Sequence, residues 1–134
     1  MITLSKAQEA LKAAQEKAKE LGIAVSIAIV DEHGFLLAFA RMDSAITISP
    51  KFAYAKAYTA GMLGMPTGDM AGYAIEGKPY QGLDSIFGGE LTTIAGGMPV
   101  MIDGKLVGGV GVGGSTDVSQ DAACAAQAVK VLSS

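Results

Sequence analysis

The chain has 134 residues and a formal net charge of −3, and half of its residues are hydrophobic while only 17% are charged. This length fits one domain, which we take to span residues 1–134. The lack of any basic cluster argues against a nucleic-acid partner, whose phosphates require lysine and arginine. The longest uncharged runs, Leu91–Ile102 and Leu106–Thr116, are too short for a helix that spans a membrane.

The composition also predicts how the protein assembles and where in the cell it is located. The mean hydropathy is +0.38, and a small monomer has little interior in which to bury so much apolar surface, so we expect a homo-oligomer. Residues 1–10 become charged and helical at once, unlike a signal peptide. The single cysteine, Cys124, cannot form an intramolecular disulfide. We therefore expect a cytoplasmic protein that assembles with copies of itself.

The chain begins with a predicted amphipathic helix over residues 4–21. Its apolar residues recur at spacings of three and four, while lysines and glutamates fill the opposite face. Thr3 or Ser5 can cap the first turn, and Gly22 can end the helix. We interpret the charged side as the solvated face of a packed helix.

A β-hairpin follows this helix. Residues 23–30 and 35–41 alternate large apolar side chains with small ones, which predicts two strands. Gly34 stands where the connecting turn needs a positive φ. The small residues leave room on the second face of the hairpin for a helix to pack closely.

The middle of the chain is predicted to be helical and then irregular. Ser49-Pro50 predicts a helix start with the serine as cap, and Gly64 predicts its end. Residues 66–77 predict a shorter helical piece. Residues 78–95 show no clear periodicity, so we expect a mostly irregular segment that could face a ligand.

The last part of the chain combines a second hairpin with a final helix. Strands are predicted over residues 98–102 and 105–112, with Asp103-Gly104 as a two-residue turn. A helix is predicted over residues 118–132, with Asp117 as its cap. The tight turn makes the sheet antiparallel at this point.

A glycine-rich motif lies in this second hairpin. Gly109-Val-Gly111-Val-Gly113-Gly114 matches the G-x-G-x-x-G pattern of dinucleotide-binding proteins. That fingerprint needs a following helix and then a second parallel strand with an acidic residue. The residues after Gly114 provide the helix but no second strand, and the strand before the motif belongs to a tight hairpin. We therefore expect no dinucleotide site.

The glycines suggest two other roles, which are compatible with each other. A strand without side chains lets a helix or a neighbouring subunit approach its backbone. In addition, Gly114 and Ser115 precede a helix and could present backbone N–H groups to an anion. We favour close packing as the main role.

In this order of elements the chain resembles the GlcG/HbpS-type haem-binding family, which includes the C-terminal domain of PduO-type proteins. The resemblance lies in IAIVDEHGFLLAFARMDSA (27–45), KFAYAKAYTA (51–60), GGMPVMIDGKLVGGVGVGG (96–114) and Asp121 of the last helix. It implies an α+β domain whose five-stranded antiparallel sheet is flanked by helices, as in profilin-like folds. It also implies closed oligomers, often octamers, and haem or related tetrapyrrole binding in some members.

Candidate haem ligands are few in this sequence. Haem iron is usually held by His, Cys, Met or Tyr, and the only histidine is His33, which we interpret chiefly as a solvated turn residue. Tyr54 and Tyr58, one helical turn apart, are the other axial candidates, although their spacing also fits a core. The methionines that could serve instead are Met62, Met65 and Met70. No His and Cys spacing indicates any other metal site.

Two cations are candidates for binding a carboxylate or a haem propionate. Arg41 closes the second predicted strand, and Asp43 could orient it. Lys56 lies among alanine and aromatic residues, where it either points to solvent or faces a pocket. If it faces a pocket, both cations could reach one sheet edge near Gly96 and Gly97. Burial would then lower the pKa of Lys56 and make it a candidate catalytic base or nucleophile.

Two functions remain open at this point. The first is a cytoplasmic homo-oligomer that holds haem or a related tetrapyrrole in a pocket or at a subunit interface. The second is a cofactor-independent isomerase, lyase or hydratase that acts on a small carboxylate held by Arg41, Lys56 and the glycine-rich segment. We favour haem binding, on the resemblance alone.

Overall fold

The computed structural model describes residues 1–134. Its α-helices are α1 (Leu4–Leu21), α2 (Ser49–Leu63) and α3 (Val118–Leu132). Its strands are β1 (Ser26–Asp31), β2 (Leu36–Arg41), β3 (Gly97–Ile102) and β4 (Lys105–Gly113). Three short 3-10 helices lie between α2 and β3, namely η1 (Thr67–Tyr73), η2 (Leu83–Ser85) and η3 (Phe87–Gly89). None of the helices combines the length and the apolar character needed to cross a membrane.

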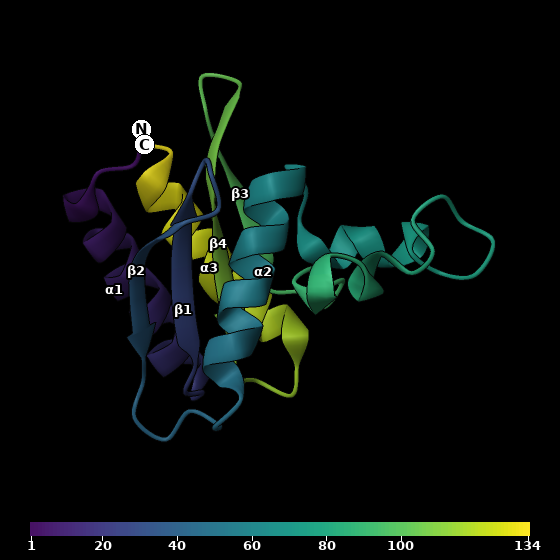
Figure 1. Cartoon of the computed structure of the whole chain (residues 1–134). Helices are drawn as coiled ribbons and strands as arrows, with labels where there is room; N and C mark the ends of the chain where they lie inside the picture. The colour runs from purple at the N-terminus through teal and green to yellow at the C-terminus, as the bar shows by residue number, and fades with distance from the viewer.

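The elements form three layers (Figure 1). The four strands make one antiparallel sheet in the order β2-β1-β4-β3. Helices α1 and α3 pack together on one face of this sheet, and α2 covers the other face. The residues between α2 and β3 extend as an arm away from the layered body (Figure 1).

The expectation of five strands is wrong, because the sheet has four. The four strands of the two predicted hairpins are the four that form, and the fifth rested only on the family resemblance. The remaining long connection, between α2 and β3, contains several glycines and no alternation of apolar and polar residues. It forms η1, η2 and η3 instead of a strand, so β3 is left as an edge of the sheet.

Most of the predicted turns and helix ends are confirmed. The φ angles of Asp103 and Gly104 are 52° and 76°, as a tight hairpin turn requires. The N-cap of α1 is Thr3, whose hydroxyl accepts a hydrogen bond from the Lys6 N–H, and Gly22 ends α1 with φ 73°. These local signals are reliable here because each depends only on neighbouring residues.

The start of α2 differs from the prediction. Its N-cap residue is Ile48, and Ser49 is the first helical residue. The hydroxyl of Ser49 instead shares a 2.8 Å hydrogen bond with the hydroxyl of Ser26 on β1, and both side chains are buried. A tertiary contact has replaced the local cap, and it attaches the first turn of α2 to the sheet.

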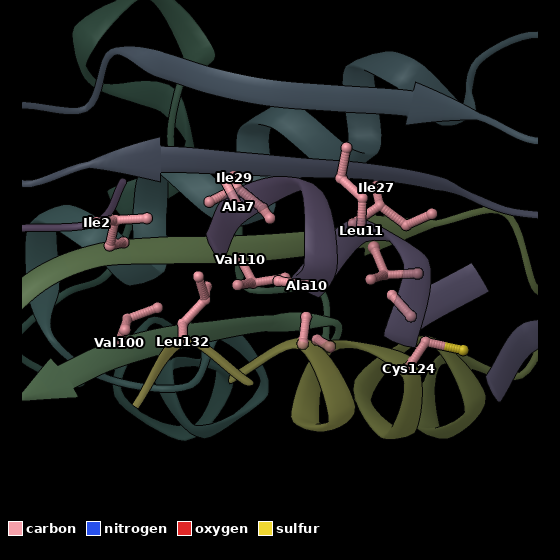
Figure 2. Packing of buried hydrophobic residues seen from close by; sticks show 14 of the residues in the cluster. Ile2, Ala7, Ala10, Leu11, Ile27, Ile29, Val100, Val110, Cys124 and Leu132 are labelled. Carbon is pink, nitrogen blue, oxygen red and sulfur yellow. The ribbon is translucent and has the colours of Figure 1, made fainter. Parts of the chain in front are cut away.

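The larger core lies between the sheet and the helix pair α1/α3. Alanines of both helices and β-branched residues of the strands fill it, as Figure 2 shows for Ala7, Ala10, Ile27, Ile29 and Val110. The small side chains allow the two helices to pack closely against each other. Cys124 of α3 is fully buried in this core, and burial raises the pKa of its thiol to about 11.

The other face of the sheet packs against α2 through Ala28 and Val30 of β1 and through glycines of β4. Along β4, Val110 and Val112 belong to the α1/α3 core, so the alternating Gly109 and Gly111 face α2. A Cβ atom at Gly111 would collide with the backbone of α2 at Ala53 and Ala57. The interpretation of the glycine block as a close-packing surface is therefore confirmed.

We predict that Gly111→Ala lowers the free energy of unfolding by about 3 kcal/mol or more, because the backbone of α2 leaves the new methyl group no room. Gly72→Ala is the matched control, since a Cβ atom at that position would have no neighbouring atom within 4 Å. It should change stability by less than about 0.5 kcal/mol. Urea denaturation at one fixed protein concentration compares the two variants. Equal stability of both would contradict the packing account.

Candidate functional site

The most unusual side chains in the structure are a buried lysine and a buried aspartate. The side chains of Lys56 and Asp121 are only 2% and 1% exposed. The Lys56 Nζ atom lies 3.2 Å from an Asp121 carboxylate oxygen and also donates a 2.9 Å hydrogen bond to the Val112 carbonyl. Since Lys56 belongs to α2 and Asp121 to α3, this pair joins the two helical layers across the sheet.

The second carboxylate oxygen of Asp121 is also occupied. It accepts a 3.1 Å hydrogen bond from the Ser115 N–H, just before α3. The Ser115 hydroxyl donates to the Gln120 side chain at 2.7 Å and accepts from the Asp117 N–H at 3.1 Å. The N–H group of Ser115, which the sequence suggested for an external anion, therefore binds a carboxylate of the same chain.

Burial shifts both members of the pair towards their neutral forms. Loss of hydration lowers the pKa of Lys56 and raises the pKa of Asp121, and the attraction between the two groups opposes each shift. A buried lysine with a lowered pKa beside a buried carboxyl group is an acid–base pair in chemical terms. Both side chains are buried from solvent, and neither lines a surface hollow.

Gly96 and Gly97 lie directly against Lys56. A Cβ atom at Gly96 would come within 2.8 Å of the Lys56 Nζ atom, and one at Gly97 would collide with the Lys56 carbonyl. Both glycines therefore bring the start of β3 against the lysine side chain and its backbone.

Arg41 and Asp43 lie elsewhere. Arg41 is the last residue of the edge strand β2 and pairs with Ser26 of β1. Its guanidinium donates a 3.2 Å hydrogen bond to the Ala45 carbonyl. Strand β1 separates β2 from β4, so Arg41 and the Val112 partner of Lys56 are about two strand spacings, or roughly 10 Å, apart across the sheet. The residues that line a surface hollow of about 330 Å³ there are Gln15, Lys19, Arg41, Met42 and Asp43. The structure does not bring Arg41 to Lys56.

A second hollow, of about 390 Å³, opens beside the outer face of α2. Its lining residues are Pro50, Lys51, Tyr54, Ala55, Gly89 and Glu90. The Tyr54 hydroxyl donates to the Gly34 carbonyl at 3.2 Å, and the Tyr54 ring stacks on Tyr58 with 6.1 Å between centroids. Partial burial, and then the nearby Glu90 carboxylate, raise the pKa of Tyr54. We call this space the tyrosine hollow.

The other candidate haem ligands do not line this hollow. His33 lies in the β1–β2 turn with its side chain 72% exposed. Met70 is buried with Leu83 and Leu91 in a small cluster at the base of the arm, and Tyr58 packs against that cluster. Among the axial candidates from the sequence, Tyr54 alone lines a surface hollow.

Asp121 was not predicted from the sequence as the partner of Lys56. The spacing of the helix does indicate that Asp121 is buried. Asp121 precedes Ala125 and Ala128 by four and seven residues, so it lies on the same inner face of α3 as these two buried alanines. An acidic residue on a buried helix face requires a partner. That partner lies 65 residues earlier in the chain, and no local pattern identifies it.

The volume of the tyrosine hollow, about 390 Å³, lies within the range of small-molecule sites. The chain matches the family described as haem degrading protein HbpS-like over residues 2–130. It belongs to this family, so the resemblance seen in the sequence is confirmed.

Three similar proteins illustrate this relationship. An uncharacterised 15.0 kDa protein of Citrobacter freundii is 35% identical over 132 residues, which are 98% of this chain and 92% of that protein. The corrinoid adenosyltransferase PduO of Salmonella typhimurium is 34% identical over 121 residues, which are 90% of this chain but only 36% of PduO. The crystal structure of a PduOC:haem complex has a TM-score of 0.92 and 32% identity, covering 97% of this chain and 94% of that one.

We predict that Lys56→Met and Asp121→Leu each lower the free energy of unfolding by about 3–5 kcal/mol, because each leaves one buried charge without its partner. The double variant should recover most of this loss, since apolar side chains can replace a buried ion pair at little cost. Urea denaturation of the four proteins gives the coupling energy. Additive single effects, or a Lys56→Met variant as stable as the parent, would contradict the buried pair.

Proposed function

We propose that this protein binds haem, or a closely related tetrapyrrole, in the tyrosine hollow. The observation that carries the proposal is that a tyrosine, a cation and apolar side chains line one hollow. Membership of the HbpS-like family and the haem complex of the PduOC relative support the same ligand class. These three kinds of side chain can bind the iron, a propionate and the ring system of a haem, respectively.

Four of the six lining residues have distinct roles in this proposal. Tyr54 would give up its hydrogen bond to the Gly34 carbonyl and hold the iron through its phenol oxygen, and Lys51 would bind a propionate. Pro50 and Ala55 would contact the apolar ring system. The bound haem would supply iron redox chemistry, which no side chain can provide. Because tyrosine binds ferric iron after losing its proton, the raised pKa of Tyr54 should make binding weaker at neutral pH than at alkaline pH.

We further propose that the protein acts as a cytoplasmic homo-oligomer, with the octamer as its expected form. A hollow of about 390 Å³ is at the lower end of the range for small-molecule sites, so a neighbouring subunit would cover the rest of the ligand. Large apolar side chains that remain exposed support assembly. Those on or near the hairpin and α2 are Phe35, Leu36, Phe39, Ile46, Ile48 and Phe52, and those on the arm are Tyr73, Ile75, Tyr80, Ile86 and Phe87.

The alternative, a small enzyme acting on a carboxylate, has less support from the geometry. Its proposed base, Lys56, is buried against Asp121 and lines no hollow. Arg41 lies on the far edge of the sheet. An enzyme of this kind would require the buried pair to open to its substrate.

We predict that the ligand-free protein binds ferric haem with a shifted Soret band and that affinity rises with pH between about 6 and 9. Tyr54→Phe should abolish the tyrosinate spectrum and weaken binding about tenfold or more, and Lys51→Gln should weaken it about tenfold. Absorbance titration measures both effects, and native mass spectrometry reports haem and subunit number together.

The matched controls are Tyr80→Phe, on the arm, and His33→Ala, in the exposed turn, since neither residue lines a hollow. Both variants should bind haem like the parent. If Tyr54→Phe also binds like the parent with an unchanged spectrum, the site is wrong. If the parent takes up no haem, the function is wrong, and a monomer in native mass spectrometry would refute the assembly.

A further inference from the structure

The carboxylate of Asp121 has donors on both of its oxygens, and these donors come from two other segments of the chain. One oxygen receives the Lys56 ammonium of α2 at 3.2 Å, and the other receives the Ser115 N–H at 3.1 Å. The Gly114 and Ser115 N–H groups both stabilise the charged form of the carboxylate against burial. Such a two-sided arrangement of donors is how proteins recognise bound carboxylates.

The surrounding backbone is shaped to leave space for this contact. A Cβ atom at Gly96 would lie 2.6 Å from the Val112 carbonyl oxygen and 2.8 Å from the Lys56 Nζ atom. A Cβ atom at Gly114 would lie 2.7 Å from the Ala24 carbonyl oxygen. Glycine at positions 96 and 114 therefore allows the lysine and the N–H groups to converge on one point.

We infer that Lys56 and the Ser115 N–H form a carboxylate-binding site whose occupant in this chain is its own Asp121. The occupant is held in place because α3 carries it into the site from the opposite face of the sheet. External anions are consequently excluded here, and the acidic groups of any ligand must bind elsewhere on the protein. This inference does not depend on haem binding.

Removing the occupant should convert this closed contact into a site for a small free carboxylate. Asp121→Ala keeps the Cβ atom and deletes only the carboxylate, so it leaves an unpaired buried ammonium beside a space of matching size. Formate is the smallest ion that offers two oxygens to the same donors. Chloride has the same charge but cannot accept from both donors with two separate atoms.

The test is the melting temperature of Asp121→Ala in sodium formate and in sodium chloride at equal ionic strength. In chloride the variant should melt about 10 °C or more below the parent, because its buried ammonium is unpaired. Formate at several hundred millimolar should raise the melting temperature of the variant by several degrees relative to chloride. The parent should melt at the same temperature in both salts.

Two further variants test whether the formate effect depends on the Lys56 ammonium and on the vacated position of the Asp121 carboxylate. Lys56→Met/Asp121→Ala lacks the ammonium, and Glu16→Ala removes an exposed carboxylate from α1, so neither should distinguish formate from chloride. The Ser115 amide signal of Asp121→Ala should also shift with formate in NMR spectra. If the single variant does not fold in chloride, its refolding yield replaces the melting temperature as the readout.

Equal behaviour of Asp121→Ala in formate and chloride, by melting temperature or by refolding yield, would overturn the inference. An equal formate effect in Lys56→Met/Asp121→Ala would also overturn it, because the lysine would then not be part of the site. A formate effect confined to the variant that keeps Lys56 is the result that the structure requires.

Discussion

The close contact between α2 and the backbone of β4 is the constraint on which the rest of the structure depends. Gly109 and Gly111 have no side chains, so α2 rests on the strand with its Ala53 and Ala57 backbone in contact. This contact fixes the rotation of the helix about its own axis. Lys56 consequently points into the protein, while Lys51 and Tyr54 lie on the outer side and line the tyrosine hollow.

A helix placed this way can bury a charge only if the sheet and the opposite layer provide partners. The Val112 carbonyl and the Asp121 carboxylate do so, and no buried side-chain nitrogen or oxygen lacks a hydrogen bond. Burying two charges rarely adds net stability, because the loss of hydration offsets their attraction. The pair is better understood as a positioning contact, since it holds α2, the end of β4 and the start of α3 in one arrangement.

Features that depend on neighbouring residues could be predicted from the sequence, whereas those that depend on distant contacts could not. Alternation predicted β1 and β2, the Asp103-Gly104 turn predicted β3 and β4 on either side of it, and the Thr3 cap was predicted from local chemistry. Strand order is not a local property, so Arg41 and Lys56 were expected to share a site although β1 separates β2 from β4. The tyrosine hollow was not predicted because Gly89 and Glu90 return to α2 from an irregular segment.

The most direct test of this account is an NMR measurement of the Lys56 side chain. An ammonium group buried against Asp121 and Val112 should exchange its protons slowly with water. Its Nζ signal should therefore remain visible near neutral pH, with a cross-peak to the Gly96 α-protons. The signals of exposed lysines should be lost through fast exchange. If the Lys56 signal behaves like that of an exposed lysine, the helix is not held against the glycine strand as described, and the account fails.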